Sequence, residues 1–388
     1  PDLSTNDSKK QQQADSGGLS MDNSGAENHT TIFTIAESPI DENVIWVGTD
    51  DGNVQVTKDG GKNWQNVVSN IEGLPSNTWT YHIEASVHGK GIAYAVFDGH
   101  NSGDMKPYVY KTSDFGTTWT NIITDNVTGT SRNIQEDYEN ENLLFLGTEF
   151  GLYITADGGK NWEKFTKNVP PVAVHFIDLQ KQTNDLVLGT HGRGIIIIED
   201  ISPLREITTE VLKSKLHFFS SKTMKLSDES GFAGSFGAET QFVGENANRS
   251  PQIKYLLPKR HTFGKMSMEI KNSKGEVVSK LSPGKSKGIN IVNWSGNIKQ
   301  PKVAKGKTLA FGGFATPRVE AGSYKAVITK GRDVYEHTFE IVYDERSGLT
   351  SADRKMKHDI MSKMYKMTEE LAYMVYQIDA FIEAPKTK

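Results

Sequence analysis

The chain has 388 residues and no cysteine, and its 44 Lys and Arg residues against 48 Asp and Glu residues give a net charge of −4. This length is enough for two or three domains. The lack of cysteine excludes a disulfide framework, a thiolate metal site and a cysteine nucleophile. No run of about 18 apolar residues occurs, which excludes a membrane-spanning helix.

The charge is divided unevenly along the chain. Residues 1–200 hold 13 basic and 28 acidic residues, a net charge of −15, whereas residues 201–388 hold 31 and 20, a net charge of +11. An acidic first half repels a phosphate backbone, so we expect no nucleic-acid partner, and cations, basic peptides and neutral sugars remain open. The scattered lysines of the second half are typical of a solvated surface.

One phrase occurs three times in the first half, as TKDGGKNW, TSDFGTTW and TADGGKNW, at spacings of 55 and 43 residues. Such a period is the size of one four-stranded propeller blade. Each phrase lies between two short alternating segments, which predicts a hairpin turn. We expect its aspartate to accept hydrogen bonds from the turn, its glycine to supply positive φ and its tryptophan to seal the blade. These structural residues are Asp59, Gly61, Trp64, Asp114, Gly116, Trp119, Asp157, Gly159 and Trp162.

The phrase matches the Asp-box, or BNR, repeat, S/T-x-D-x-G-x-T/S/N-W. Together with flanking text such as LLFLGTEFGLYITADGGKNWEKF, it makes the chain resemble the large bacterial propeller proteins related to sortilin, which are often labelled glycosyl hydrolases. The family uses the box structurally, on the propeller face remote from the ligand. The resemblance therefore implies the fold more directly than the function. It also implies a secreted, periplasmic or cell-envelope location.

The predicted fold class is mainly β: a partial propeller of about 3.5 blades, then an immunoglobulin-like β-sandwich and a C-terminal α-helix. Blades are expected at about 31–67, 79–123 and 130–165, with a half-blade at 172–200, all within a propeller domain at 31–203. A closed propeller has four to eight blades and exposes no long edge. The resemblance thus implies further N-terminal blades, and the polar segment 1–30 is interpreted as the tail of one.

The second half predicts three further parts. Residues 204–249 are expected to form a linker or loop. Short alternating strands in residues 250–346 predict the sandwich. It resembles the immunoglobulin-like domain of the flagellar hook-capping FlgD type, with Trp294 and Tyr324 at the characteristic positions. Residues 349–384 predict an amphipathic helix that begins with a Thr350–Asp353 capping box. Its apolar residues recur at 4-3 spacing, which predicts a partner: a missing helix, the sandwich or a second copy.

A candidate site follows from blade topology. Turns in a four-stranded meander alternate between the two faces of the disc, so the turn between strands two and three, and the start of strand one, lie opposite the Asp-box. The polar and aromatic residues of these segments are the candidate ligand-binding residues: His29, Asp50, Trp79, His82, Asp98, His100, Arg132, Glu149, His191 and Arg193. His175, in an apolar strand, is interpreted as a core residue. The acidic candidates also have a structural interpretation, because aspartate beside glycine often forms turns.

The leading functional hypothesis is an extracytoplasmic propeller module that binds a carbohydrate or a peptide at an acidic face without catalysis. The alternative is a glycoside hydrolase that uses two of Asp50, Asp98 and Glu149, since that chemistry takes two carboxyl groups about 5 to 10 Å apart. Sialidase chemistry is disfavoured because only two arginines reach the site. A third hypothesis is a scaffold that docks another protein. No cofactor or metal is expected, and no HExxH, P-loop, GxSxG or dinucleotide motif occurs.

Overall fold

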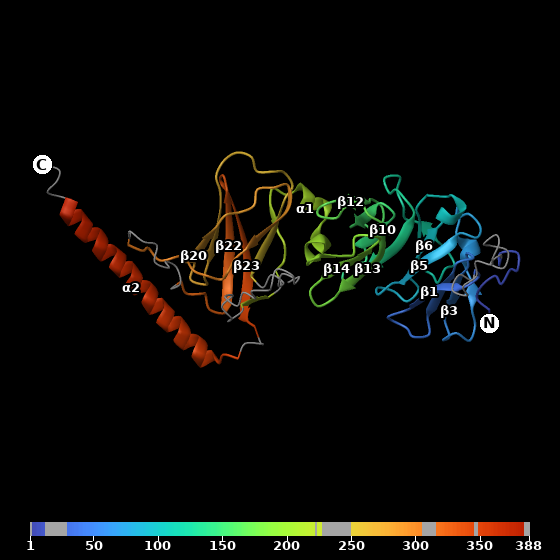
Figure 1. The fold of residues 1–388 in the computed structure, drawn as a ribbon, viewed down its shortest axis with the longest axis horizontal. Coiled ribbons are helices and arrows are strands. Elements are labelled where there is room, and N and C mark those ends of the chain that lie inside the picture. Colours follow the sequence, from blue (N-terminus) through green and yellow to red (C-terminus); the bar gives the residue numbers. More distant parts are fainter. Residues whose placement is uncertain are drawn as a thin grey trace, which may run out of the picture. The chain divides into compact units, whose positions relative to one another are not determined.

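A computed structural model describes residues 2–11, 29–221, 223–226, 250–304, 316–344 and 348–383. The chain divides into two compact units, Pro1–Thr208 and Thr209–Lys388, and each is described by itself. Both units are built mainly from strands (Figure 1). Most of the predicted tail 1–30, the second half of the predicted loop 204–249 and residue 384 lie outside the described residues.

In the described part of the first unit, antiparallel sheets follow one another along the chain, each with its strands in sequential order. The strands of the first two sheets are β1 (Ile32–Glu37), β2 (Ile45–Thr49), β3 (Val54–Thr57) and β4 (Gln65–Asn66), then β5 (Trp79–Ala85), β6 (Ala93–Asp98), β7 (Tyr108–Thr112) and β8 (Thr120–Asn121). Those of the next two are β9 (Ser131–Glu136), β10 (Leu144–Thr148), β11 (Gly151–Thr155) and β12 (Glu163–Phe165), then β13 (Val174–Gln180), β14 (Asp185–Thr190) and β15 (Ile195–Ile198).

Each sheet packs its face against the next sheet in the chain. The buried clusters join the first sheet to the second, the second to the third and the third to the fourth. Strand β10 is therefore buried at every position, as expected for a strand covered on both faces. This arrangement of three four-stranded blades and one three-stranded blade confirms the predicted partial propeller. On the last sheet, Ile195 and Ile197 stay exposed, and the prediction of further blades stays a prediction.

The three hairpins that carry the repeated phrase, called Asp-box hairpins here after the motif that the phrase resembles, join the third and fourth strands of their blades and have the same hydrogen bonds. In the first, the Thr57 hydroxyl donates to Asp59 at 2.8 Å, and the Asn63 N–H donates to the same Asp59 oxygen at 2.9 Å. The Gly61 N–H donates to Thr57 Oγ1 at 3.0 Å, and the glycine has a φ of 89°. The same bonds recur around Asp114 and Asp157, so the aspartate of each box is held by the turn that contains it.

The second and third boxes also pack between blades, because their tryptophans lie against the preceding sheet. Trp162 is 1% exposed, and its indole N–H donates to the Ile122 carbonyl of the second blade at 2.7 Å. A Cβ added to Gly159 would lie 2.8 Å from Ile122 Cβ, so a larger residue has no room there. Trp64 differs, since its indole N–H donates to Gly61 within its own hairpin.

Residues 2–11 lie against the turn between β2 and β3. The Leu3 carbonyl accepts hydrogen bonds at 3.0 Å from the side-chain amides of Asn53 and Gln55. The hydroxyl and the backbone N–H of Thr5 both donate to Asp51, which is 1% exposed.

The second unit is a sandwich of two sheets, followed by a helix. One sheet has the order β16-β18-β21 and the other β17-β23-β22-β19-β20, and they share one core. In that core Trp294 meets Tyr324 edge-on, with ring centroids 5.9 Å apart. The elements are β16 (His217–Phe218), β17 (Met224–Leu226), β18 (Gln252–Leu257), β19 (Met266–Lys271), β20 (Val277–Leu281), β21 (Gly288–Asn293), β22 (Gly322–Lys330) and β23 (Asp333–Tyr343).

The described helices are short except for the last. The 3-10 turns are η1 (Val68–Asn70), η2 (His100–Ser102) and η3 (Ser202–Glu206), and the α-helices are α1 (Thr209–Lys213) and α2 (Ser351–Glu383). The predicted capping box of α2 is confirmed: the Asp353 N–H donates to Thr350 Oγ1 and the Thr350 N–H donates to Asp353 Oδ2. No described residue of α2 is buried, and the whole apolar stripe is exposed.

Candidate functional site

Strand register places the candidate segments at one end of the blades and the Asp-boxes at the other. At the first end, the last residue of strand two pairs with the start of strand one in all four sheets, as Thr49 with Ile32, Asp98 with Trp79, Thr148 with Ser131 and Thr190 with Val174. At the other end, the Asp-box threonines pair with the starts of strand two, as Thr57 with Ile45, Thr112 with Ala93 and Thr155 with Leu144.

A β-bulge interrupts the innermost strand of every blade near that first end. The register skips one residue in each strand, and these four bulged residues are Phe33, Tyr81, Arg132 and His175. A bulge leaves its residue out of the ladder and re-aims its side chain, often beside a functional site. We call these four residues the bulge cluster.

Tyr81 contacts the other three members of the bulge cluster. Its ring centroid lies 5.3 Å from that of Phe33 and 5.2 Å from the guanidinium carbon of Arg132. Its hydroxyl lies 3.3 Å from Nδ1 of His175. Burial raises the pKa of Tyr81, which keeps the phenol neutral. The bulge cluster is thus one continuous surface built from all four blades.

Two carboxylates from different blades hold Arg132. Nη1 donates to Asp98, whose side chain is fully buried, and Nη2 donates to Glu149 at 2.9 Å. His100 Nδ1 binds the same Asp98 carboxylate at 2.7 Å. The guanidinium therefore occupies the space between Asp98 and Glu149, where a hydrolase would place the glycosidic bond.

His175 is half-buried rather than part of the core, so its interpretation as a core residue is wrong. The bulge turns its ring toward Tyr81, and the His191 ring stacks on it with ring centroids 5.5 Å apart. Burial and the nearby charge of Arg132 lower the pKa of His175. The imidazole is accordingly neutral at pH 7.

No hydrogen bond or ion pair among the described residues joins the remaining candidate residues to Arg132. Asp50 forms a local group, in which it accepts hydrogen bonds from Thr31 and lies 3.4 Å from Nδ1 of His29. Trp79 packs edge-on against Phe33, with ring centroids 4.5 Å apart. Arg193 is exposed in the turn between β14 and β15. The structure does not bring Asp50 or Arg193 together with Glu149 through any described contact.

A cavity of about 720 Å³ runs beside the innermost strands and contains the bulge cluster in its wall. Strands β1, β5, β9 and β13 all line it. Each of them is the end strand of its sheet, so the edge of each strand away from its sheet has no strand partner in the described residues. His82 also lines this cavity, and its Nε2 lies 3.8 Å from Glu84.

Sequence reasoning missed Phe33 and Tyr81, although a signal for them exists. An isoleucine follows each bulged residue at the second position, as Ile35, Ile83, Ile134 and Ile177. When the four inner strands are aligned on these isoleucines, the same position of the alignment holds Phe33, Tyr81, Arg132 and His175. The pattern is short, and only the register shifts show that it marks a bulge.

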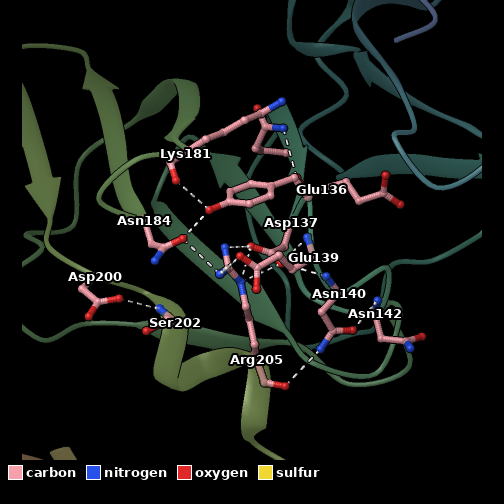
Figure 2. A network of polar contacts seen from close by, with 12 residues as sticks. Glu136, Asp137, Glu139, Asn140, Asn142, Lys181, Asn184, Asp200, Ser202 and Arg205 are labelled. Atoms are coloured by element: carbon pink, nitrogen blue, oxygen red, sulfur yellow. Dashed lines mark hydrogen bonds and ion pairs between the residues drawn. The ribbon is translucent and has the colours of Figure 1, made fainter. Parts of the chain in front are cut away.

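A second polar network lies at the Asp-box end of the blades (Figure 2). Arg205 of η3 donates to Asp137 in the turn after β9 and to Asn184 in the turn after β13. Its guanidinium carbon lies 4.6 Å from the centroid of the Tyr138 ring. Burial alone would lower the pKa of Arg205, but the hydrogen bonds from this arginine to Asp137 and Tyr138 raise it. The network clamps the last two blades and is structural.

The described residues hold no group of three or more His, Asp or Glu side chains arranged for a metal ion. Within the same residues, no helix is long and apolar enough to cross a membrane.

No family model and no curated protein sequence matches the chain. Solved structures similar to it include YCF48 bound to a D1 peptide, with 19% identity, 44% of this chain and 52% of that chain covered, and a TM-score of 0.34. A GH74 enzyme from Niastella koreensis has 17% identity, coverage of 47% and 25%, and a TM-score of 0.34. The GH74 xyloglucanase from Xanthomonas campestris has 12% identity, coverage of 80% and 45%, and a TM-score of 0.38.

The chain thus spans about half the length of YCF48 and less of the two GH74 enzymes. The strand order and register of the chain itself show the propeller blades.

Proposed function

We propose that the first unit is a non-catalytic binding module that takes a carbohydrate or a peptide at the bulge cluster. The observation that carries the proposal is the recurrence of one bulge in all four inner strands, each with a side chain in the wall of one cavity. Aromatic faces beside a few fixed polar groups are the usual composition of a ligand pocket.

The same geometry argues against the hydrolase alternative. Asp98 is buried beneath Arg132, and Glu149 lies on the other side of the same guanidinium. Asp50 is engaged by Thr31 in its own turn. A glycosidase needs two carboxyl groups that flank an open space for the bond, one of which gives up a proton. Arg132 fills that space.

An extracytoplasmic location is part of the proposal and follows from the Asp-box resemblance. Cell fractionation with an antibody against the chain tests it separately from ligand binding.

The test of binding uses the full chain on glycan and peptide arrays, followed by titration of every ligand that is captured. Phe33→Ala is the informative variant, because Phe33 is 46% exposed and its loss removes contact area without opening the core. We expect at least tenfold weaker binding, since a stacked aromatic ring contributes about 1.5 kcal/mol or more. Phe263→Ala, which removes an aromatic ring 87% exposed in the second unit, is the matched control.

Two results contradict the proposal: blank arrays, or a ligand that Phe33→Ala binds as tightly as the unchanged chain. Release of reducing ends from a polysaccharide panel, abolished by Glu149→Gln, establishes the hydrolase instead.

A further inference from the structure

Acidic and amide side chains occupy the same position of three inner strands in the wall of the cavity. The residue after the inner-strand isoleucine is Glu84 in β5, Gln135 in β9 and Asp178 in β13. The register confirms this shared position, because these residues pair with Tyr94, Phe145 and Val187 at equivalent positions of strand two. All three line the cavity, and Gln135 donates to Glu84 Oε1 at 2.7 Å. The second oxygen of Glu84 lies 3.8 Å from His82 Nε2.

A buried acceptor points to a donor from outside the chain. Asn133 lines the same cavity and is 2% exposed, and its side-chain oxygen has no hydrogen-bond partner among the described residues. Leaving such an oxygen unpaired costs about 1–3 kcal/mol, and a ligand N–H removes that cost. Asn133 lies two residues before Gln135, so their side chains point to the same side of β9.

The charges of the cavity wall favour a cation. Its acidic residues outnumber its two basic ones, Arg132 and Lys181, and are Glu37, Glu84, Glu136 and Asp178. Arg132 already forms ion pairs with Asp98 and Glu149. The surrounding half of the sequence has a net charge of −15 within residues 1–200, which draws cationic ligands toward it.

The wall also suits an extended chain rather than a small ion. Strands β1, β5, β9 and β13 each turn an edge without a strand partner toward their neighbours in the described part of the unit, and such an edge offers N–H and C=O groups to an added peptide. Exposed Phe33 and Phe176 lie in the same wall. The methylene stem of a lysine packs on apolar surface of this kind while its ammonium reaches the acids.

From these contacts we infer that the ligand of the cavity is a basic peptide segment, one of whose lysine or arginine side chains reaches Glu84 and Asp178. This inference rests on the proposed binding function and narrows its ligand. The ammonium or guanidinium is held by the two carboxylates, and its remaining N–H groups reach the Asn133 oxygen.

The experiment titrates the full chain against a labelled peptide in which lysine alternates with serine, with fluorescence anisotropy as the signal. The same peptide with acetylated lysines tests the charge, and a neutral oligosaccharide tests the other ligand class. Glu84→Gln and Asp178→Asn are each expected to weaken binding about tenfold or more, because each removes one charge-assisted hydrogen bond. Glu163→Gln, which neutralises an exposed carboxylate on the outermost strand β12, is the matched control and is expected to bind as tightly as the unchanged chain.

Equal loss of affinity in Glu163→Gln, or no loss in Glu84→Gln and Asp178→Asn, shows a general attraction to the acidic unit and overturns the inference. Equal binding of the acetylated peptide does the same. If an oligosaccharide binds through Phe33 while the lysine peptide does not, the binding function stands and the inference falls. If neither ligand class binds, both fall.

Discussion

Arg205 donates hydrogen bonds to both carboxylate oxygens of Asp137, which lies 68 residues earlier in the chain. The Asp137 side chain is fully buried, and that of Arg205 is 8% exposed. The pair joins the third blade to the segment that leaves the fourth. Removing Arg205 takes the opposite charge away from a buried carboxylate, which then keeps only the hydrogen bonds from the Glu139 and Asn140 N–H groups.

Arg205→Met is therefore expected to lower the free energy of unfolding by about 3–5 kcal/mol, measured by urea denaturation. Glu139→Gln serves as control, because Glu139 contacts the same guanidinium but is 52% exposed, and its loss is expected to cost about 1 kcal/mol or less. A double variant, Arg205→Met with Asp137→Asn, is expected to recover part of the stability, because the amide is uncharged and its oxygen still accepts from the Glu139 and Asn140 N–H groups. Equal small effects of Arg205→Met and Glu139→Gln contradict this account of the clamp.

Gly147 is expected to tolerate no side chain. A Cβ at this position would lie 2.4 Å from the Val174 carbonyl oxygen of the next blade, so the backbone of β13 must move. We expect Gly147→Ala to destabilise the first unit by about 1–3 kcal/mol in a thermal or chemical unfolding experiment. Gly189→Ala is the matched control, because the nearest atom to its Cβ, Phe176 Cβ, lies at 3.4 Å in ordinary contact. If both variants unfold alike, close packing between blades is not what requires glycine.

Trp162 and Trp64 occupy the same position of two Asp-boxes and are expected to differ in importance. Trp162 is buried between two blades and donates to Ile122 of the preceding blade, whereas Trp64 is half-buried and donates within its own hairpin. Trp162→Ala is expected to cost about 3–5 kcal/mol of unfolding free energy, and Trp64→Ala clearly less. An equal cost for both variants is the contrary result.

The Asp-boxes are expected to make stability fall in acid. The backbone N–H of Asn63, its side-chain amide and the Thr57 hydroxyl lower the pKa of Asp59 from 3.8 to about 2. Because the folded pKa lies below the unfolded one, the stabilisation is fully present above pH 3.8 and is lost as the pH falls toward 2. Between these two pH values, the unfolding temperature is expected to fall less steeply with pH in Asp59→Asn than in the unchanged chain. An unchanged slope in that variant speaks against the assignment.

His175 is expected to titrate below its ordinary pKa of 6.5, because it is partly buried and lies near Arg132. Glu149 acts in the opposite direction, so Glu149→Gln is expected to lower the pKa of His175 further. The imidazole resonances in an NMR titration measure both changes. Since the folded pKa lies below the unfolded one, this group also destabilises the fold as the pH falls below 6.5. A midpoint above 6.5 rules out the proposed surroundings of the ring.

The Asp-box hairpins and the blades were predictable, because each box is a local device whose residues all lie within one short phrase. The Asp59 carboxylate, for example, accepts hydrogen bonds from Thr57 and Asn63, which both lie within four positions of it. The alternation of turns between two faces then followed from strand counting, and it led to Arg132 and Glu149 as residues of one end.

The bulge cluster was not predictable in the same way. Whether Tyr81 points into a blade or into the cavity depends on a shift of one residue in register, and a one-residue shift reverses every side chain after it. Arg205 lies in the segment expected to be a linker, and its partner Asp137 is distant in the sequence. Both features depend on which blades meet, and a single sequence does not carry that information.

Each Asp-box hairpin forms the hydrogen bond between its threonine and its aspartate within itself. The joints between blades differ from one another, because side chains bond across them in different ways, as Asn70 to Gly116, Ser86 to Glu136 and Arg205 to Asp137. A blade is therefore a repeated local unit with its own attachment to each neighbour, and removing one blade would leave polar groups of the next blade unpaired. The wall of the cavity also changes its chemistry with each blade, so substitutions there can alter the ligand without affecting the hairpins that hold each blade together.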